Sequence, residues 1–221
     1  MFKRFSICYI LLMFCITGTS AQEDRWTGNA TNLSKGNLRV NSSGRYLEYS
    51  DGTPFLYIGD TAWELISRLN DKETELYLEN RREKGFTVIQ TVILDELDDM
   101  DVSSNGEPKL IDGNIDKPAP GYFTHVDKVI SLAAAKGLYI ALLPTWGDKV
   151  DKQWGKGPEI FTPENAYRYG KWLGERYMNA SNLIWIIGGD RSGDGKNFAI
   201  WNALATGIKS VDKNHLMTYQ P

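Results

Sequence analysis

The chain has 221 residues, with 28 acidic and 25 basic side chains and a formal net charge of −3 at pH 7. Nucleic-acid-binding proteins carry a basic patch or stripe, which this sequence lacks, so we expect no nucleic-acid partner. Both cysteines, Cys8 and Cys15, lie near the N-terminus, and the two histidines are 90 positions apart (215 − 125). This spacing does not suit a zinc site, so we expect no metal and no cofactor.

Residues 1–21 have the pattern of a secretory signal peptide. Two basic residues precede a short apolar stretch from Phe5 to Ile16, and small residues lead to Ala21. The apolar stretch is too short to cross a bilayer comfortably. We therefore expect cleavage near Ala21-Gln22, a secreted or periplasmic protein and no membrane span after cleavage. The polar residues 22–36 are expected to form an extended segment.

The rest of the chain alternates predicted strands and helices. Two short alternating runs, Leu38–Val40 and Tyr46–Tyr49, flank a glycine-containing loop and predict a β-hairpin. Apolar runs typical of buried strands then start at about residues 55, 86, 138, 183 and 215. Helical patterns separate these runs. One starts at an Asn70 cap and ends at Gly85, and the others follow Gly121, Thr162 and Asp194.

This alternation predicts right-handed βαβ units, which build a parallel sheet with helices outside it. No glycine-rich phosphate loop follows the first strand, which disfavours a doubly wound nucleotide-binding fold. An α/β fold of the (β/α)8 TIM-barrel type fits better, although a complete barrel typically takes about 250 residues. We therefore expect residues 37–221 to be the N-terminal part of a barrel, truncated after about five strands and opening with the short β-hairpin.

Polar and aromatic side chains follow each predicted strand. They are Asp60 and Trp63, then Asp95 and Glu96, then Trp146 and Asp148, then Asp190 and Arg191, and finally Tyr219 and Gln220. In a barrel these strand ends meet at the face where active sites lie. Two glycines directly before Asp190 allow a substrate to approach that carboxylate closely. Carboxylates beside aromatic platforms are typical of glycoside hydrolysis, so we expect Asp190 to be catalytic. The residues expected to bind substrate are Asp60, Trp63, Glu96, Trp146, Asp148, Arg191 and Tyr219.

Simpler interpretations of these residues remain open. Asp190 could be a turn aspartate at a strand end, and Trp63 and Trp146 could serve packing alone. The acidic residues Asp98, Asp99 and Asp101 are better explained as a solvated loop.

Four segments together resemble one known family. Pro54–Leu65, Gly85–Gln90, Asn182–Arg191 and His215–Tyr219 resemble the apiosidase-like glycoside hydrolase family, in the right order and from about Leu38 to the C-terminus. The resemblance implies a (β/α)8 barrel and retaining cleavage of apiose linkages in the pectin rhamnogalacturonan II. It implies that Asp190 is the general acid/base and that the nucleophilic glutamate belongs to a later strand, beyond Pro221. We also expect Gln90, which ends the second segment, to contact substrate.

The predicted function is therefore that of a secreted glycoside hydrolase acting on an oligo- or polysaccharide of the plant cell wall, represented by a fragment without the nucleophile. A non-catalytic carbohydrate-binding remnant of such a barrel is the alternative. A third possibility is a structural half-barrel that needs a partner segment to fold.

Overall fold

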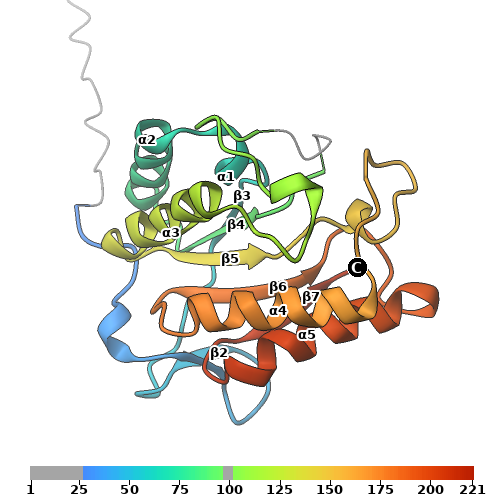
Figure 1. Ribbon diagram of the computed structural model, residues 1–221. Helices are drawn as coiled ribbons and strands as arrows, with labels where there is room; N and C mark the ends of the chain where they lie inside the picture. The colour runs from blue at the N-terminus through green and yellow to red at the C-terminus, as the bar shows by residue number, and fades with distance from the viewer. Residues whose placement is uncertain (1–26, 97–101) are drawn as a thin grey trace, which may run out of the picture.

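The computed structural model of the protein describes residues 27–96 and 102–221 (Figure 1). The expected signal peptide, residues 1–21, lies outside the described residues, as do Asp98, Asp99 and Asp101. Their expected roles stay predictions.

A parallel five-stranded sheet lies at the centre of the molecule. Its strands are β3 (Gly59–Thr61), β4 (Val88–Val92), β5 (Tyr139–Leu143), β6 (Leu183–Gly188) and β7 (Met217–Gln220). They are hydrogen-bonded in the order β3-β4-β5-β6-β7, and each is parallel to the next. This arrangement confirms the predicted strand–helix repeat of a (β/α)8 barrel, of which five strands are present in the described residues.

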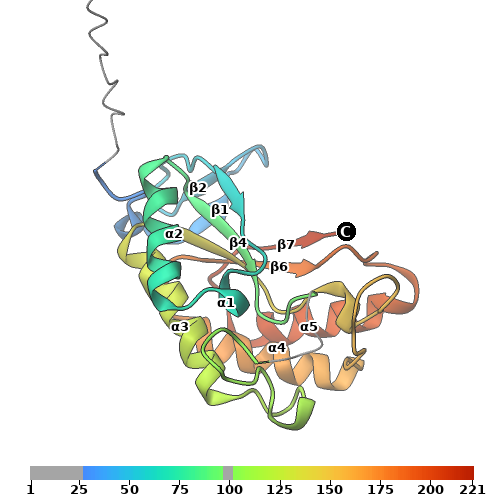
Figure 2. The same ribbon diagram turned by 90° about the horizontal axis from the view of Figure 1, so that it is seen from above.

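Helices follow the strands and cover one side of the sheet. They are α1 (Leu65–Arg68), α2 (Asp71–Glu83), α3 (Pro120–Ala135), α4 (Pro163–Tyr177) and α5 (Phe198–Val211). Figure 2 shows α3, α4 and α5 together on one face of the sheet. Short 3₁₀ helices occur at η1 (Leu33–Lys35), η2 (Ile111–Gly113), η3 (Gly147–Lys149) and η4 (Gly195–Asn197).

The starts of two helices follow from local sequence. The Asn70 side chain accepts hydrogen bonds from the backbone of Lys72 and Glu73, and the Glu73 side chain accepts one from Asn70 N–H in return. This is the capping box that the sequence predicts at the start of α2. At α4, the Thr162 side chain accepts from Asn165 N–H directly before Pro163, as also predicted.

Successive side chains along each strand point to opposite faces of the sheet, and each face packs against a different apolar cluster. Ile89 and Trp185 point to the helices and belong to the large apolar core that the helices cover. Val88, Ala141 and Ile186 point to the opposite face and form a second apolar cluster. Strands buried on both faces explain why these segments are almost continuously apolar in the sequence.

The predicted N-terminal hairpin is present and covers the second cluster. Strands β1 (Leu38–Val40) and β2 (Leu47–Tyr49) pair antiparallel and lie across the sheet from the helices (Figure 2). The Phe55 ring, just after the hairpin, lies 5.1 Å from the ring of Tyr139 and 5.5 Å from that of Tyr49, measured between centroids. Because Tyr139 begins β5, the hairpin covers the N-terminal end of the sheet on the face opposite the helices.

Two expectations about local structure are wrong. The sequence predicts the first strand from about residue 55, whereas β3 begins at Gly59. Residues before it bond to the hairpin instead, because Phe55 N–H donates to Leu47 O (2.8 Å) and the Phe55 ring is buried in the hairpin cluster. The segment 22–36 is not extended throughout. Its described part contains η1, which begins where the Asn32 side chain accepts from Ser34 N–H (3.0 Å).

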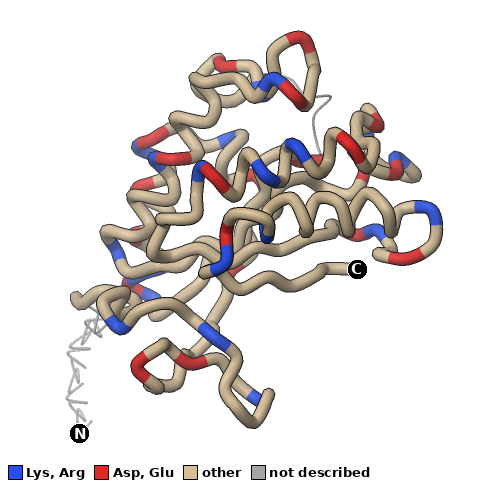
Figure 3. The backbone as a smooth tube through the Cα atoms, turned by 60° about the horizontal axis from the view of Figure 1, so that its bottom comes forward, with Lys and Arg blue, Asp and Glu red and all other residues tan. Residues whose placement is uncertain are grey.

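Charges of both signs are distributed over the molecule. Figure 3 shows Lys and Arg interleaved with Asp and Glu along the helices and loops. Among the residues that the structure describes, none of the helices is long and apolar enough to cross a membrane.

A buried polar network ties the start of β7 to β6. The Asp212 carboxylate accepts from Trp185 Nε1 (2.7 Å) and lies 2.7 Å from His215 Nδ1. The other ring nitrogen of His215 lies 2.6 Å from the Ala180 carbonyl oxygen. Burial alone would raise the pKa of Asp212. The hydrogen bonds from His215 and Trp185 lower it by more than burial raises it, so the pKa lies well below its ordinary value.

We expect Asp212→Asn to lower the free energy of unfolding by about 2 kcal/mol at pH 7, because two buried donors lose a charged acceptor. A depressed folded-state pKa contributes stability above the ordinary value of 3.8, and this stability is lost as the pH falls below it. The difference between wild type and variant should therefore shrink below about pH 4. Urea unfolding at pH 7 and pH 3 measures both effects.

Asp116→Asn is the matched control for this experiment. Asp116 pairs with Arg168 (2.7 Å) in a largely exposed ion pair, and such pairs contribute about 0–1 kcal/mol. An equal loss of stability in the two variants at pH 7 would contradict the assigned importance of the Asp212 network.

Candidate active site

The C-terminal ends of neighbouring strands are hydrogen-bonded to one another at one edge of the sheet. Trp146 N–H, after β5, donates to Leu94 O after β4 (2.7 Å). Gly147 N–H donates to Gly189 O after β6 (3.1 Å), and Gly189 N–H donates to Gln220 O at the end of β7 (3.0 Å). In Figure 2, β6 and β7 run toward this edge, where the C-terminus also lies. The side chains that follow the strands are thereby held close together.

The turn after β6 has an unusual backbone. Gly188, Gly189 and Asp190 have φ values of 105°, 128° and 56°. A Cβ atom at Gly188 would lie 2.0 Å from Gln220 O, and one at Gly189 would lie 2.9 Å from Gly147 N. Glycine is therefore required at both positions. Asp190 adopts a left-handed conformation, which costs a residue with a side chain about 1–3 kcal/mol and is often found at functional sites.

This turn presents Asp190 to solvent. Its side chain is exposed, and its Oδ1 accepts a hydrogen bond from Gln220 Nε2 (3.1 Å) on the neighbouring strand. The predicted catalytic carboxylate thus lies at the C-terminal edge of the sheet, oriented by a side chain from β7.

A small pocket lies along the same edge, after β3, β4 and β5. It has a volume of about 120 Å³ and is lined by Trp63, Glu64, Val92, Glu96 and Trp146. The rings of Trp63 and Trp146 are 5.1 Å apart between centroids, with an angle of 56° between their planes. Three residues predicted to bind substrate are therefore brought together in one pocket.

Both carboxyl groups of this pocket have raised pKa values. Burial raises the pKa of Glu96, and the negative charges of Asp148 and Asp190 raise it further, against an opposing effect of Arg191. Burial also raises the pKa of Glu64, with a further contribution from the charge of Asp95. In both cases the main cause is burial, which disfavours the ionised form of a carboxyl group.

Asp95 and Asp148 serve as buried structural charges. Asp95 forms a fully buried ion pair with Lys109 (2.5 Å). Asp148 is likewise fully buried beside Lys149 (3.1 Å) and accepts from Gly157 N–H (2.7 Å). Asp148 was expected to bind substrate, but its position is behind the pocket, where it raises the pKa of Glu96.

Arg191 and Tyr219 hold the loops in place. Arg191 is almost completely buried, and its guanidinium donates to the carbonyl oxygens of Asp151 (2.6 Å), Asp190 (2.7 Å) and Lys152 (2.9 Å). Tyr219 Oη donates to the Arg191 carbonyl oxygen (2.7 Å). Their direct partners are thus backbone groups of the loops around Asp190.

Asp60 and Gln90 lie away from the pocket. The Asp60 carboxylate accepts from Tyr77 Oη (2.6 Å) and pairs with Arg81, both on α2. Gln90 lies within β4 on the face opposite the helices, where its Nε2 donates to Tyr57 Oη (3.4 Å). The structure does not bring these two side chains to Asp190, and a role in substrate binding stays a prediction for both.

Two residues of this site are not among those predicted to bind substrate, although the sequence places Gln220 at a strand end. Glu64 directly follows Trp63, and its carboxylate comes into the pocket through the short turn before α1. Gln220 follows Tyr219, and the alternation of a strand sends these two neighbours to opposite faces. Applying that alternation to the fifth predicted strand would have selected Gln220 rather than Tyr219.

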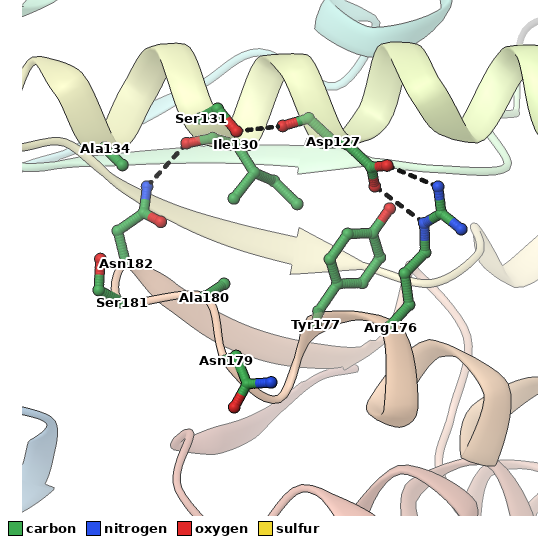
Figure 4. Close-up of a pocket in the computed structure, with 10 residues that line it drawn as sticks. All are labelled: Asp127, Ile130, Ser131, Ala134, Arg176, Tyr177, Asn179, Ala180, Ser181 and Asn182. Carbon is green, nitrogen blue, oxygen red and sulfur yellow. Dashed lines mark hydrogen bonds and ion pairs between the residues drawn. The ribbon is translucent and has the colours of Figure 1, made fainter.

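A larger cavity of about 380 Å³ lies elsewhere, between the C-terminal ends of α3 and α4 (Figure 4). Two of its polar side chains, Arg176 and Asn182, are hydrogen-bonded to neighbouring residues, whereas the buried Tyr177 hydroxyl makes no hydrogen bond to another described residue. Arg176 forms two hydrogen bonds with Asp127 (2.8 and 2.5 Å), and Asn182 Nδ2 donates to Ile130 O and Leu138 O. Because Asn182 precedes β6, this cavity lies at the opposite end of that strand from Asp190. These hydrogen bonds join α4 to α3, and the residue before β6 to α3 and to the start of β5.

Within residues 27–96 and 102–221, no group of three or more His, Cys, Asp or Glu side chains is placed to hold a metal ion.

Solved structures with the same fold include glycoside hydrolases. One described as a glycoside hydrolase has a TM-score of 0.74 and 42% identity, over 85% of this chain and 41% of its own. A glycoside hydrolase family 5 protein from Bacteroides vulgatus ATCC 8482 has a TM-score of 0.75 and 35% identity, over 85% and 39%. The endo-1,4-β-mannanase of Rhizomucor miehei, with 17% identity and a TM-score of 0.55 over 82% and 60%, shares the fold alone.

The chain spans 41% and 39% of the length of the first two structures. No curated protein matches it in sequence. The sequence model described as "Apiosidase-like, catalytic domain" matches residues 41–221. With the barrel topology and the strand-end residues in place, this match identifies the chain as a member of the apiosidase-like catalytic-domain family.

Proposed function

We propose that the protein is a glycoside hydrolase in which Asp190 is the general acid/base. The observation that carries this proposal is the position of Asp190. It is exposed at the end of β6, oriented by Gln220 (3.1 Å), and close enough to Glu96 to affect its pKa. Glu96 in turn lines the pocket with Trp63 and Trp146. A proton donor beside aromatic rings and carboxyl groups is what glycosidic bond cleavage requires.

In the proposed reaction, Asp190 donates its proton to the glycosidic oxygen as the bond to the leaving group breaks. Because Gln220 holds one carboxyl oxygen, we assign the proton to the other. Trp63, which is partly exposed and packs on the buried ring of Trp146, offers an apolar face to a sugar ring, and the carboxyl groups of Glu64 and Glu96 offer hydrogen bonds to its hydroxyl groups.

A retaining hydrolase also needs a nucleophilic carboxylate. By resemblance to the family, we assign it to a glutamate on a later barrel strand. The similar solved structures are longer than this chain, which spans 41% and 39% of them, so such a strand belongs to the part that the chain does not match.

The substrate that we propose is a plant cell-wall polysaccharide, namely an apiose-bearing side chain of pectin such as those of rhamnogalacturonan II. Membership of the apiosidase-like family supports this substrate class. The signal-peptide pattern of residues 1–21 supports secretion or export to the periplasm, where such polymers are met.

In a longer form of the protein that includes the later strand with the nucleophilic glutamate, we expect Asp190→Asn to reduce kcat on a rhamnogalacturonan II oligosaccharide by about a hundredfold or more, the scale of a lost proton transfer. A dinitrophenyl apioside should lose far less, since its leaving group departs without protonation. Steady-state kinetics on the two substrates measure the difference. Asp194→Asn, the same substitution at an exposed residue of the same loop, should leave both rates unchanged.

Equal losses on the two substrates would mean that Asp190 is a turn residue and not the acid. A longer wild-type form that includes the proposed nucleophile and binds the oligosaccharide without cleaving it would favour the non-catalytic carbohydrate-binding alternative.

We expect Glu96→Gln to stabilise the protein at neutral pH. A carboxyl group with a raised folded-state pKa binds more protons in the folded than in the unfolded state, so stability falls as the pH rises above its ordinary value of 4.5. Glutamine removes this effect. The variant should melt at a higher temperature than wild type at pH 7 and at the same temperature at pH 4. Glu75→Gln, at an exposed position of α2, should change neither value, and a gain that persists at pH 4 would contradict the assigned cause.

A further inference from the structure

The loop between β5 and α4 carries an exposed tryptophan. Trp154 is 69% exposed, although a tryptophan ring contributes most to stability or binding when it is covered. The loop, gold in Figure 1, lies at the same end of the sheet as the C-terminus and therefore as Asp190. Substrates approach a barrel from this end.

The ring of Trp154 has a fixed position. The guanidinium of Arg191 lies over it, with Cζ 4.1 Å from the ring centroid. Three hydrogen bonds to backbone carbonyl groups fix that guanidinium in turn, one of them to Asp190 O (2.7 Å). Arg191 covers one face of the indole, and since most of Trp154 is exposed, the opposite face is open to solvent.

The loop beneath the ring is anchored on both sides. The Asp151 carboxylate accepts from Gln153 (2.9 Å), Asn197 (3.1 Å) and Lys196 (3.0 Å), which lower its pKa to about 2. At the other end of the loop, Gly157 N–H donates to the buried carboxylate of Asp148 (2.7 Å). An anchored loop presents its side chain without a large loss of entropy on binding, which favours affinity.

The surroundings of Trp154 favour a sugar over a protein partner. Residues 151–157 read Asp-Lys-Gln-Trp-Gly-Lys-Gly, so a single apolar ring stands among polar residues and glycine. A protein interface of ordinary size covers about 800 Å² on each side and has a larger apolar core. A sugar ring has C–H groups on one face and hydroxyl groups at its rim, so it matches one aromatic face surrounded by polar groups.

We propose that Trp154 is the stacking platform of an outer sugar subsite, which binds a residue of an oligosaccharide beyond the bond that is cleaved. This inference rests on the proposed function. It makes the natural ligand an oligosaccharide rather than a simple glycoside, because Trp154 lies across the Arg191 side chain from Asp190 and not in the pocket of Trp63 and Trp146.

Calorimetric titration with a disaccharide and a tetrasaccharide prepared from rhamnogalacturonan II tests the proposal. Wild type should bind the tetrasaccharide more tightly. Trp154→Ala should weaken tetrasaccharide binding by roughly tenfold, the scale of one lost aromatic contact, and should leave disaccharide binding within about twofold of wild type. Trp154→Phe keeps an aromatic face and should recover part of the loss, whereas Trp154→Leu should not.

Tyr46→Ala is the matched control, since Tyr46 is 47% exposed but belongs to the hairpin at the other end of the molecule. It should bind both saccharides as wild type does. Equal melting temperatures for wild type and the variants show that the fold is intact.

Tetrasaccharide binding by Trp154→Ala equal to that of wild type would overturn the subsite, as would an equal loss in Tyr46→Ala or no binding of either saccharide to wild type. In a longer form that carries the nucleophilic glutamate, Asp190→Asn separates the two proposals, because it should reduce cleavage by about a hundredfold and keep the tighter binding of the tetrasaccharide. Absent cleavage in the wild type of that longer form, with binding that depends on Trp154, supports the subsite and rejects the catalytic role.

Discussion

The close approach of three strand ends is the constraint on which the site depends. A Cβ atom at Gly147 would lie 2.2 Å from Gly189 O, and one at Gly188 would lie 2.0 Å from Gln220 O. The chain can therefore carry no side chain at these points, and the backbone groups bond directly from one strand end to the next. Asp190 follows at once, in a left-handed conformation that directs it outward. The position of the carboxylate is thus a result of backbone packing rather than of the loop's own preference.

Buried charges support the loops around this turn. The ion pairs Lys109–Asp95 and Lys149–Asp148 are inaccessible to solvent. Removing one partner of such a pair destabilises the fold strongly, because the other charge is left uncompensated. Arg191 adds a positive charge whose hydrogen bonds go to backbone carbonyl groups instead of a carboxylate. The negative charge of Asp95 raises the pKa of Glu64, and that of Asp148 raises the pKa of Glu96. The same ion pairs therefore fix the loops and shift the pKa values of the carboxyl groups that line the pocket.

Most of the fold could be predicted from the sequence, because caps and apolar runs are local signals. The capping boxes at Asn70 and Thr162 and the strand order are examples. The side-chain roles were harder to predict, because they depend on contacts between distant segments. Nothing near Asp60 in the sequence shows that it meets α2, and nothing near Arg191 shows that Asp151 and Lys152 receive its hydrogen bonds. Trp154 has no helical or strand pattern around it, so only its contact with Arg191 gives it significance.

The hairpin at the N-terminal end of the sheet has a consequence for biosynthesis. Phe55 packs against Tyr139, which is 84 positions later in the chain (139 − 55). At a synthesis rate of about 5–20 residues per second, the hairpin emerges roughly 4 to 17 seconds before the strand that it covers. During that interval Leu38, Tyr49 and Phe55 have no completed sheet to pack on. The apolar face of the hairpin is therefore made well before the strand that buries it, and during that interval it is a surface that chaperones can bind.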